Sequence, residues 1–239
     1  MARTYVIADI HGCLEEVERL LEFISPNSDD TLCFLGDYVD RGPSPKGVIA
    51  RLIRLAQEGP RCVFLKGNHE DMFLAYIGYP GHYGDAFLFN GGETTAASYG
   101  IQGLRGRAAA ERLPLPHLQF LLDLKTQVQL GNFLCVHAGI RPGRALKEQS
   151  DEDLLWIRED FILSEHTFPL TVLFGHTPQR EVLLHLPFKV GLDTGLVYWN
   201  KLSCFELSER QLVQIRRGER HVTTSSIAAE FGRAKPLVT

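Results

Sequence analysis

The stretch Gly36-Asp37-Tyr38-Val39-Asp40-Arg41-Gly42 sets two carboxylates and an arginine in one glycine-bracketed turn, directly after the apolar run that ends at Leu35. Charged side chains are costly to bury unless an opposite charge meets them. We therefore expect a buried strand that delivers acidic residues to a functional loop. Two further polar turns also follow apolar runs, and we interpret all three as one site: Asp9-Ile10-His11-Gly12 and Gly67-Asn68-His69-Glu70.

Strand and helix patterns alternate over the first third of the chain. Apolar runs predict strands at residues 5–8, 31–35 and 62–65, and apolar residues at helical spacing predict helices at 14–24, 48–55 and 72–76. Strands that alternate with helices are typical of βαβ units and of an α/β fold. Each polar turn therefore falls at the carboxyl end of a strand, which is the edge where open α/β sheets bind their ligands.

The second half of the chain supplies two histidines in the same kind of position. His137 follows an apolar run at 133–136, which we pair in a hairpin with 126–130, and His176 follows another run at 170–174. The remaining apolar runs predict antiparallel strands at 182–184, 189–192, 203–207 and 212–215. Five strand ends thus carry polar side chains.

We expect one catalytic domain over residues 1–215. Residues 78–112 lack periodicity and are rich in glycine and aromatic residues, so this segment is predicted to be a loop-rich lid or substrate wall. After Arg216 the chain becomes basic and polar, and we therefore expect residues 216–239 to form a flexible tail.

The composition is that of a globular protein and argues against several functions. Of 239 residues, 44% are hydrophobic and 23% are charged, and the net charge is -4, so we expect no nucleic-acid partner and no membrane partner. Because no segment is long enough to span a bilayer and no signal sequence is recognised, we expect a cytoplasmic protein. The 5 cysteines lack Cys-x-x-Cys spacing and are interpreted as packing residues, Cys13 at a helix start included.

The strand ends supply one set of carboxylate, imidazole and amide side chains: Asp9, His11, Asp37, Asn68, His137 and His176. Ligands of these types suit two divalent ions such as Mn²⁺, Fe²⁺ or Zn²⁺ better than Ca²⁺, which prefers oxygen alone. Two ions about 3.5–4 Å apart turn a shared water into hydroxide near neutral pH and direct it at phosphorus. The set thus predicts a phosphoester hydrolase, with Asp37 placed to bridge both ions.

Each of these residues has a simpler interpretation when it is taken alone. A histidine after an apolar strand is more often a hydrogen-bonded core residue than a ligand, and an Asn-His pair is more often part of a turn. The repeated placement at strand ends favours the metal site. The other histidines lie outside these turns and are interpreted as surface or lid residues: His82, His117, His166, His185 and His221.

Together the turns resemble the motif series of the calcineurin-like metallophosphoesterases. The resemblance rests on Asp9-x-His11, Gly36-Asp37-x-x-Asp40-Arg41-Gly42, Gly67-Asn68-His69-Glu70, His137-Ala138-Gly139 and Gly175-His176. More narrowly, the chain is similar to bacterial and phage lambda-type members of the PPP family of serine/threonine protein phosphatases. This closer likeness is carried by Asn90-Gly91-Gly92, Trp156-Ile157-Arg158 and Asp193-Thr194-Gly195. The resemblance implies a four-layer αββα sandwich of two mixed β-sheets flanked by helices.

The resemblance also implies a division of the ligands between two divalent metal ions, with Mn²⁺ expected first and Fe or Zn as alternatives. One ion would be bound by Asp9, His11 and Asp37. The other would be bound by Asp37, Asn68, His137 and His176. Hydrolysis would proceed by direct attack of a hydroxide that bridges the two ions, without a covalent phosphoenzyme.

The remaining matches imply the groups that act on the phosphoryl substrate. His69 corresponds to the general acid that protonates the leaving oxygen, and Asp40 to the carboxylate that orients it. Arg41 and Arg158 correspond to the clamp on the phosphoryl oxygens, because a planar guanidinium can bind two oxygens at once. Asn68 and His69 would complete the substrate-binding set.

Three functions are compatible with these residues. The main prediction is a phosphatase for phosphoserine or phosphothreonine in proteins, which would also cleave small phosphoesters. The alternative is a symmetrical dinucleoside tetraphosphate hydrolase, since those enzymes share most of the turns, although they tend to carry aspartate where Glu70 stands here. A third is a non-catalytic scaffold of the same fold, which the intact ligand set and acid disfavour. The oligomeric state is left open.

Overall fold

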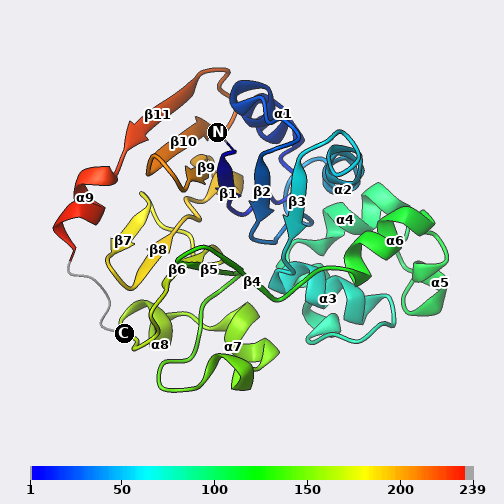
Figure 1. The fold of residues 1–239 in the computed structure, drawn as a ribbon. Helices are drawn as coiled ribbons and strands as arrows, with labels where there is room; N and C mark the ends of the chain where they lie inside the picture. Colours follow the sequence, from blue (N-terminus) through cyan, green and yellow to red (C-terminus); the bar gives the residue numbers. More distant parts are fainter. Residues whose placement is uncertain (1, 235–239) are drawn as a thin grey trace.

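The computed structural model describes residues 2–234, which form two mixed β-sheets with helices around them (Figure 1). The first sheet has the strand order β11-β10-β9-β1-β2-β3. Its strands are β1 (Thr4–Ile7), β2 (Thr31–Phe34), β3 (Arg61–Phe64), β9 (Lys201–Glu206), β10 (Gln211–Arg216) and β11 (Val222–Ser226). The strands β1, β2 and β3 run parallel, as the predicted βαβ units require, and β9, β10 and β11 pair in antiparallel fashion.

The second sheet has the order β4-β5-β6-β8-β7. Its strands are β4 (Gln127–Leu130), β5 (Phe133–Val136), β6 (Thr171–Phe174), β7 (Leu183–His185) and β8 (Lys189–Gly191). The central strands β5, β6 and β8 are parallel, and the edge strands β4 and β7 are antiparallel to their neighbours. The predicted hairpin is confirmed, because β4 pairs with β5 through Leu130 and Phe133.

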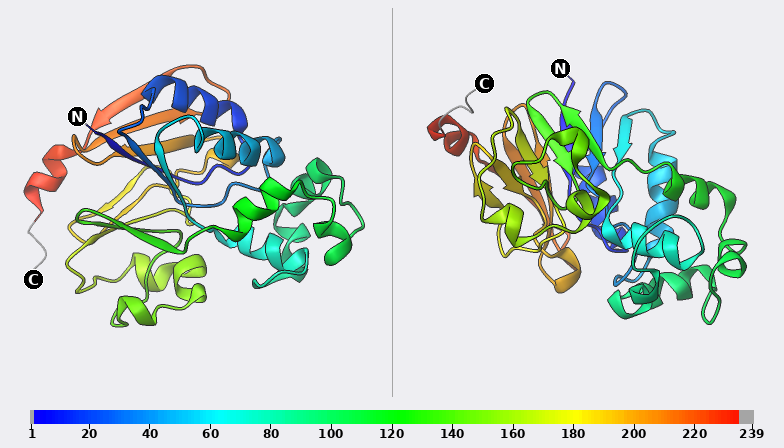
Figure 2. Two further views of the ribbon diagram at one scale, coloured as in Figure 1. Left: turned by 45° about the vertical axis from the view of Figure 1, so that its right-hand side comes forward. Right: turned by 90° about the horizontal axis from the view of Figure 1, so that it is seen from below.

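The two sheets stack face to face, and helices cover both outer faces (Figure 2). Helices α1 (Leu14–Ile24) and α2 (Pro45–Leu55) lie on the first sheet, and α7 (Asp151–Trp156) and α8 (Glu159–Ile162) lie on the second. Alternate side chains of one strand therefore enter different layers. On β1, Ile7 packs in the cluster under α1 and α2, whereas Val6 packs between the sheets. The predicted four-layer αββα architecture is confirmed.

A group of short helices lies at one end of the sandwich (Figure 1). These are α3 (Asn68–Tyr76), α4 (Gly92–Tyr99), α5 (Arg107–Ala110) and α6 (Leu115–Leu122). The prediction that residues 78–112 are loop-rich is therefore wrong for α4 and α5. Their sequences hold mostly small residues, so no apolar period marks them, although Phe87 and Ile101 of the same segment are fully buried. The segment is a packed part of the domain.

The prediction of a flexible tail from residue 216 is wrong for the part of the tail that the structure describes. Strand β11 pairs with β10 along its length, and helix α9 (Ala228–Arg233) follows it. Ile227 is buried between the sheets, and the Phe231 ring stacks on Phe205 at 5.9 Å. The polar sequence of β11 reflects an exposed edge strand, which lacks the alternation of a half-buried one. Residues 235–239 lie outside the described residues.

Two further sequence predictions concern the membrane and the cysteines. Within residues 2–234, no helix combines the length and the apolar character needed to cross a bilayer. The cysteines are free thiols, and four of them are buried while Cys62 is partly exposed. Cys13 stands at the N-cap of α1, with its Sγ 3.5 Å from the backbone oxygen of His11, so its packing role at a helix start fits.

Candidate metal centre

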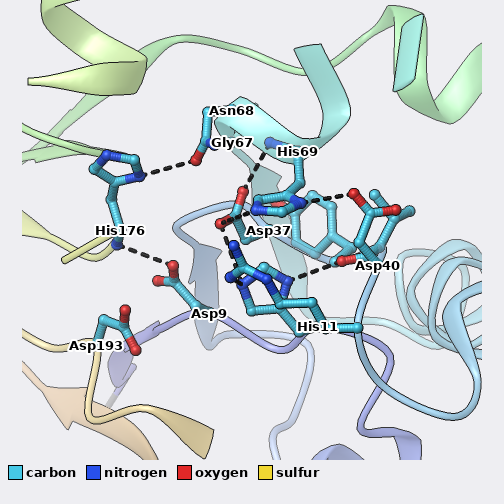
Figure 3. A network of polar contacts seen from close by, with 12 residues as sticks. Asp9, His11, Asp37, Asp40, Gly67, Asn68, His69, His176 and Asp193 are labelled. Carbon is cyan, nitrogen blue, oxygen red and sulfur yellow. Dashed lines mark hydrogen bonds and ion pairs between the residues drawn. The ribbon is translucent and has the colours of Figure 1, made fainter. Parts of the chain in front are cut away.

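The predicted site residues meet where strands of both sheets end (Figure 3). Asp9 and His11 follow β1, Asp37 follows β2, and Asn68 and His69 open α3 directly after β3. His137 follows β5 and His176 follows β6, so the second sheet contributes imidazoles to the carboxylates of the first. All seven side chains are buried, with exposures between 0% and 5%. Polar groups buried in this number are paired with one another or bind a metal ion.

The second-metal set predicted from the sequence converges on one point. Asn68 Oδ1 lies 3.0 Å from His137 Nε2 and 2.8 Å from His176 Nδ1. Asp37 Oδ1 lies 3.4 Å from the same His137 nitrogen. Ligand atoms of Asp37, His137 and His176 lie within 4.8 Å of one another, which is a spacing that one ion can bridge. The structure thus brings together all four residues of this set.

The other set is arranged around the second oxygen of Asp37. His11 Nε2 lies 3.4 Å from Asp37 Oδ2, and ligand atoms of His11, Asp37 and His69 form a second group within 4.8 Å. Asp9 is absent from that group. Its Oδ2 instead accepts a hydrogen bond from the backbone N–H of His176 at 2.9 Å, which holds the carboxylate between the two sheets. Asp37 alone reaches both groups, as its predicted bridging role requires.

Two polar atoms of the predicted ligands have no partner within the described residues. Asp9 Oδ1 and His176 Nε2 are fully buried and make no hydrogen bond there. Buried polar atoms are nearly always paired, so these two call for a ligand from outside the chain. Glycine leaves room for the carboxylates, because a Cβ at Gly175 would stand 2.0 Å from Asp9 Oδ1 and one at Gly67 would stand 2.1 Å from Asp37 Oδ1.

The protonation states also suit divalent cations. Burial lowers the pKa of His11 to about 3, and it lowers the pKa values of His137 and His176 as well. The three imidazoles are therefore neutral and offer lone pairs, as metal ligation requires. Burial opposes the ionisation of Asp37, but His137 and the other imidazoles around it lower its pKa below the usual range. The residues present fit two divalent metal ions.

Asp193 is a further acid at this site, which the sequence predictions left without a role. Its carboxylate lies beside Asp9 in Figure 3, and it accepts a hydrogen bond from the Gly195 N–H at 2.9 Å. Burial raises the pKa of Asp193 to about 6, and burial together with Asp193 raises the pKa of Asp9. Two adjacent buried carboxylates repel each other when both are ionised, so this pair also favours a bound cation. The motif Asp193-Thr194-Gly195 was the signal in the sequence.

His69 and Asp40 form the predicted acid pair. His69 Nδ1 lies 2.6 Å from Asp40 Oδ2, and Thr95 Oγ1 donates to the other Asp40 oxygen at 2.5 Å. Burial lowers the pKa of His69, but the carboxylates of Asp37 and Asp40 outweigh that effect and raise it. Since Thr95 belongs to α4, the segment predicted as a lid holds the carboxylate of this pair in place.

The two predicted clamp arginines differ in how closely they are tied to the centre. Arg41 Nη1 lies 2.8 Å from His11 Nε2, so its guanidinium stands at the metal groups. Arg158 Nη1 donates to the His176 carbonyl oxygen and to Thr177 Oγ1, each at 3.2 Å, so Arg158 is anchored on the backbone of a residue of the second group. Asp37, Asp40 and Arg41 all adopt a positive φ. Residues other than glycine rarely adopt this strained backbone conformation, and those that do are concentrated at functional sites.

Glu70 shapes the 36–42 turn, a role that sequence reasoning missed. One carboxylate oxygen accepts the backbone N–H groups of Asp37 (2.8 Å) and Gly67 (2.9 Å), and the other accepts those of Tyr38 (2.8 Å) and Val39 (3.1 Å). Burial and the neighbouring Asp37 raise the pKa of Glu70, whereas the hydrogen bonds from Val39 and Gly67 lower it. Because all four contacts are N–H donors, Glu70 accepts them as a carboxylate. A glutamate at the third position of α3 that accepts the N–H of the N-cap residue Gly67 forms half of a capping box, and this spacing could have indicated the role.

The histidines that we interpreted as surface or lid residues are not part of the two metal groups. His82 is half-exposed and bonds to Asp71 at 2.9 Å, in a separate acidic grouping with Asp151. The surface interpretation is wrong for His117 and His166, which are buried. His117 Nδ1 lies 2.9 Å from the Tyr99 hydroxyl, and His166 Nε2 lies 2.8 Å from the Phe188 carbonyl oxygen.

The fold and the site together define a metal-dependent hydrolase of phosphate esters. The family model described as calcineurin-like phosphoesterase matches residues 2–203. The chain belongs to this calcineurin-like phosphoesterase family.

Two known relatives match most of the chain. The chain is 27% identical over 240 residues to the asymmetrical bis(5'-nucleosyl)-tetraphosphatase PrpE of Bacillus velezensis, with 88% of this chain and 91% of the relative covered. The PrpE protein of Oceanobacillus iheyensis is 26% identical, with 88% and 90% covered. Neither the protein-phosphatase prediction nor the symmetrical tetraphosphatase alternative matches these names, and both stay predictions.

Solved structures support the fold. A candidate diadenosine tetraphosphatase superposes with a TM-score of 0.68 at 22% identity, over 90% of this chain and 94% of that one. A cold-active protein-tyrosine phosphatase from a psychrophilic Shewanella gives a TM-score of 0.65 at 16% identity, over 94% and 80%. At these identities the likeness concerns the architecture alone.

Proposed function

We propose that this protein hydrolyses dinucleoside polyphosphates at an asymmetrical position, releasing a nucleoside monophosphate and a nucleoside triphosphate from a tetraphosphate. The observation that carries the proposal is the similarity to asymmetrical tetraphosphatases over 88% of the chain. The site supports it, because the ligands, the acid pair and the arginines that a phosphoryl transfer needs are all in place. The 36–42 turn carries three of these groups within seven residues.

The chain's own residues divide the work of the reaction. Asp9, His11 and Asp37 would hold one metal ion, and Asp37, Asn68, His137 and His176 the other. When bound, the two ions supply a water activated toward phosphorus and charge that stabilises the transition state. Arg41 binds oxygens of the phosphoryl group, which its guanidinium reaches from beside His11.

His69 acts on the leaving group. Asp40 engages its Nδ1, so the proton to be transferred sits on Nε2, which lies 4.0 Å from Asp37 Oδ2 and thus faces the centre. The raised pKa favours the protonated imidazole, which is the form in which a general acid acts. Arg158, which is anchored on the His176 carbonyl oxygen, would orient the substrate next to the second metal group.

A second candidate function is the hydrolysis of phosphomonoesters such as phosphoserine and phosphothreonine. The specific observation in its favour is the His69–Asp40 pair at 2.6 Å. An alkoxide is a poor leaving group and depends on a proton donor, whereas a nucleotide phosphate leaves readily without one. A buried general acid that is stabilised by a carboxylate therefore contributes more to the hydrolysis of phosphomonoesters than to that of dinucleoside polyphosphates.

One substrate panel separates the candidates. The protein, loaded with Mn²⁺, Fe²⁺ or Zn²⁺, is given diadenosine tetraphosphate, a phosphothreonine peptide and a phosphodiester, and kcat/KM is compared at matched metal. We expect diadenosine tetraphosphate to be preferred, with AMP and ATP as products in ¹⁸O-labelled water. Two ADP molecules would indicate symmetrical cleavage, and a preference for the peptide would favour the second candidate. An Asp37→Asn variant controls for contaminating hydrolases.

A further inference from the structure

Two neighbouring aromatic side chains are exposed next to the centre. Tyr198 is 57% exposed and Trp199 is 71% exposed, although large apolar rings are usually buried. Both stand at the end of a single 3-10 turn, Leu196–Tyr198, which begins three residues after the buried acid Asp193. Trp199 has a φ of +66°, a left-handed conformation that bulky residues rarely adopt. The fold thus holds an exposed tryptophan in a strained position beside the site.

Each of the two rings has an arginine against it. The Arg41 guanidinium carbon lies 5.6 Å from the centre of the Tyr198 ring, and that of Arg217 lies 4.5 Å from the Trp199 ring. Arg41 is the arginine whose Nη1 stands 2.8 Å from His11. Tyr198 therefore lies against the arginine at the metal centre, and Trp199, whose Cα is about 3.8 Å further along the chain, lies against Arg217.

Two hydrogen bonds fasten this surface to the strand behind it. The Arg217 side chain donates to the Val197 carbonyl oxygen, and its backbone N–H donates to the Asn200 carbonyl oxygen at 2.8 Å. The turn is therefore tied to the end of β10 at two points. An exposed surface that is held so firmly is prepared to bind a ligand without further ordering, which favours affinity.

We propose that Tyr198, Trp199 and Arg217, which we term the aromatic shelf, bind the nucleoside and outer phosphates of a nucleoside polyphosphate. This inference rests on the proposed function and adds to it the residues that recognise the leaving group. Nucleobases stack on exposed aromatic rings, and a guanidinium binds phosphate oxygens. With Arg41 on the phosphoryl group under attack, the polyphosphate chain extends along the shelf toward Arg217. A phosphopeptide offers neither a flat base nor a second phosphate to this surface.

The decisive experiment compares substrates with and without a base. The metal-loaded full chain is assayed on diadenosine tetraphosphate, on inorganic tripolyphosphate and on p-nitrophenyl phosphate, in wild-type, Trp199→Leu and Trp199→Phe forms. Loss of one stacked base changes affinity by about 5- to 150-fold. We expect Trp199→Leu to lower kcat/KM by at least about tenfold on diadenosine tetraphosphate alone, mostly through KM, and Trp199→Phe to recover much of it. Phe23→Leu, an exposed aromatic on α1, is the matched control.

Arg217→Ala tests the charged part of the shelf. This variant should lose much more activity on diadenosine tetraphosphate and on tripolyphosphate than on p-nitrophenyl phosphate. The shelf is overturned if Trp199→Leu cleaves diadenosine tetraphosphate as well as the wild type, or if its loss is equal on all three substrates.

Failure of the proposed function gives a different result. If the wild type cleaves p-nitrophenyl phosphate but not diadenosine tetraphosphate, the dinucleoside assignment fails, and calorimetric titration with ATP then decides on the shelf. Binding by the wild type that is weakened at least about tenfold in Trp199→Leu supports the shelf. Absence of binding, or equal binding by both forms, contradicts it.

Discussion

His69 Nδ1 lies 2.6 Å from Asp40 Oδ2, and both side chains are shut off from solvent. The histidine faces the metal groups through its other nitrogen, while the carboxylate is held by Thr95 of α4. A buried imidazole left alone would be neutral. The nearby carboxylates reverse that tendency and raise the pKa of His69, which favours its protonated, proton-donating form.

The pH profile of Asp40→Asn tests this pairing. A general acid acts in its protonated form, so activity is present below the pKa of His69 and is lost as the pH rises through it. Removing the Asp40 charge lowers that pKa, and the alkaline limb of the kcat profile should move to lower pH, with a loss in kcat of roughly 10- to 100-fold. Thr95→Val should shift the limb less. An unmoved limb would assign it to another group.

The leaving group reveals whether His69 supplies the proton. His69→Asn should lower kcat on alkyl phosphates by about 10²- to 10⁴-fold and on aryl phosphates far less, because phenolates leave without protonation. Bound metal, measured by elemental analysis, should stay at the wild-type level. Equal losses on both substrate types would remove His69 from the acid role.

Glu70→Gln is expected to loosen the 36–42 turn. Each Glu70 oxygen accepts two backbone N–H groups, so an amide NH₂ in place of either oxygen would face two donors. Buried donors left unpaired cost about 1–3 kcal/mol each, and the free energy of unfolding should fall by about 2–6 kcal/mol in denaturant titrations. Glu22→Gln on the exposed side of α1 is the control. A variant as stable as the wild type would mean that the turn holds its shape without this carboxylate.

The ordered tail makes its own contribution to stability. The Arg210 guanidinium carbon lies 4.7 Å from the Phe133 ring and 4.8 Å from the Phe231 ring, so it is placed between β5 and α9. Phe231→Ala should lower the free energy of unfolding by about 1–3 kcal/mol, since the ring is partly buried. A thermal melt identical to that of the wild type would fit a flexible tail instead.

The sequence was most informative where a short local pattern determines the structure. Apolar runs that end in Asp, Asn or His placed the strands and the metal centre, because the strand period and the ligand chemistry both act locally. It was least informative where packing across the fold decides. Helix α4 has no amphipathic period, and β11 has no buried face, so neither leaves a local pattern. Glu70 was missed because three of its four partners, Asp37, Tyr38 and Val39, lie some 30 residues away in the chain.

The central claim is that Asp37 joins two metal groups into one centre. Its Oδ1 lies 3.4 Å from His137 and its Oδ2 lies 3.4 Å from His11, so the carboxylate is shared between them. The most direct measurement is the metal-to-protein ratio of the reconstituted chain, determined by elemental analysis for wild-type, Asp37→Asn and Asp85→Asn forms. The account predicts about two ions per chain in the wild type and in the exposed Asp85 control, and fewer than about one in Asp37→Asn. A wild type that binds no transition metal, or an Asp37→Asn variant that keeps both ions, would contradict it.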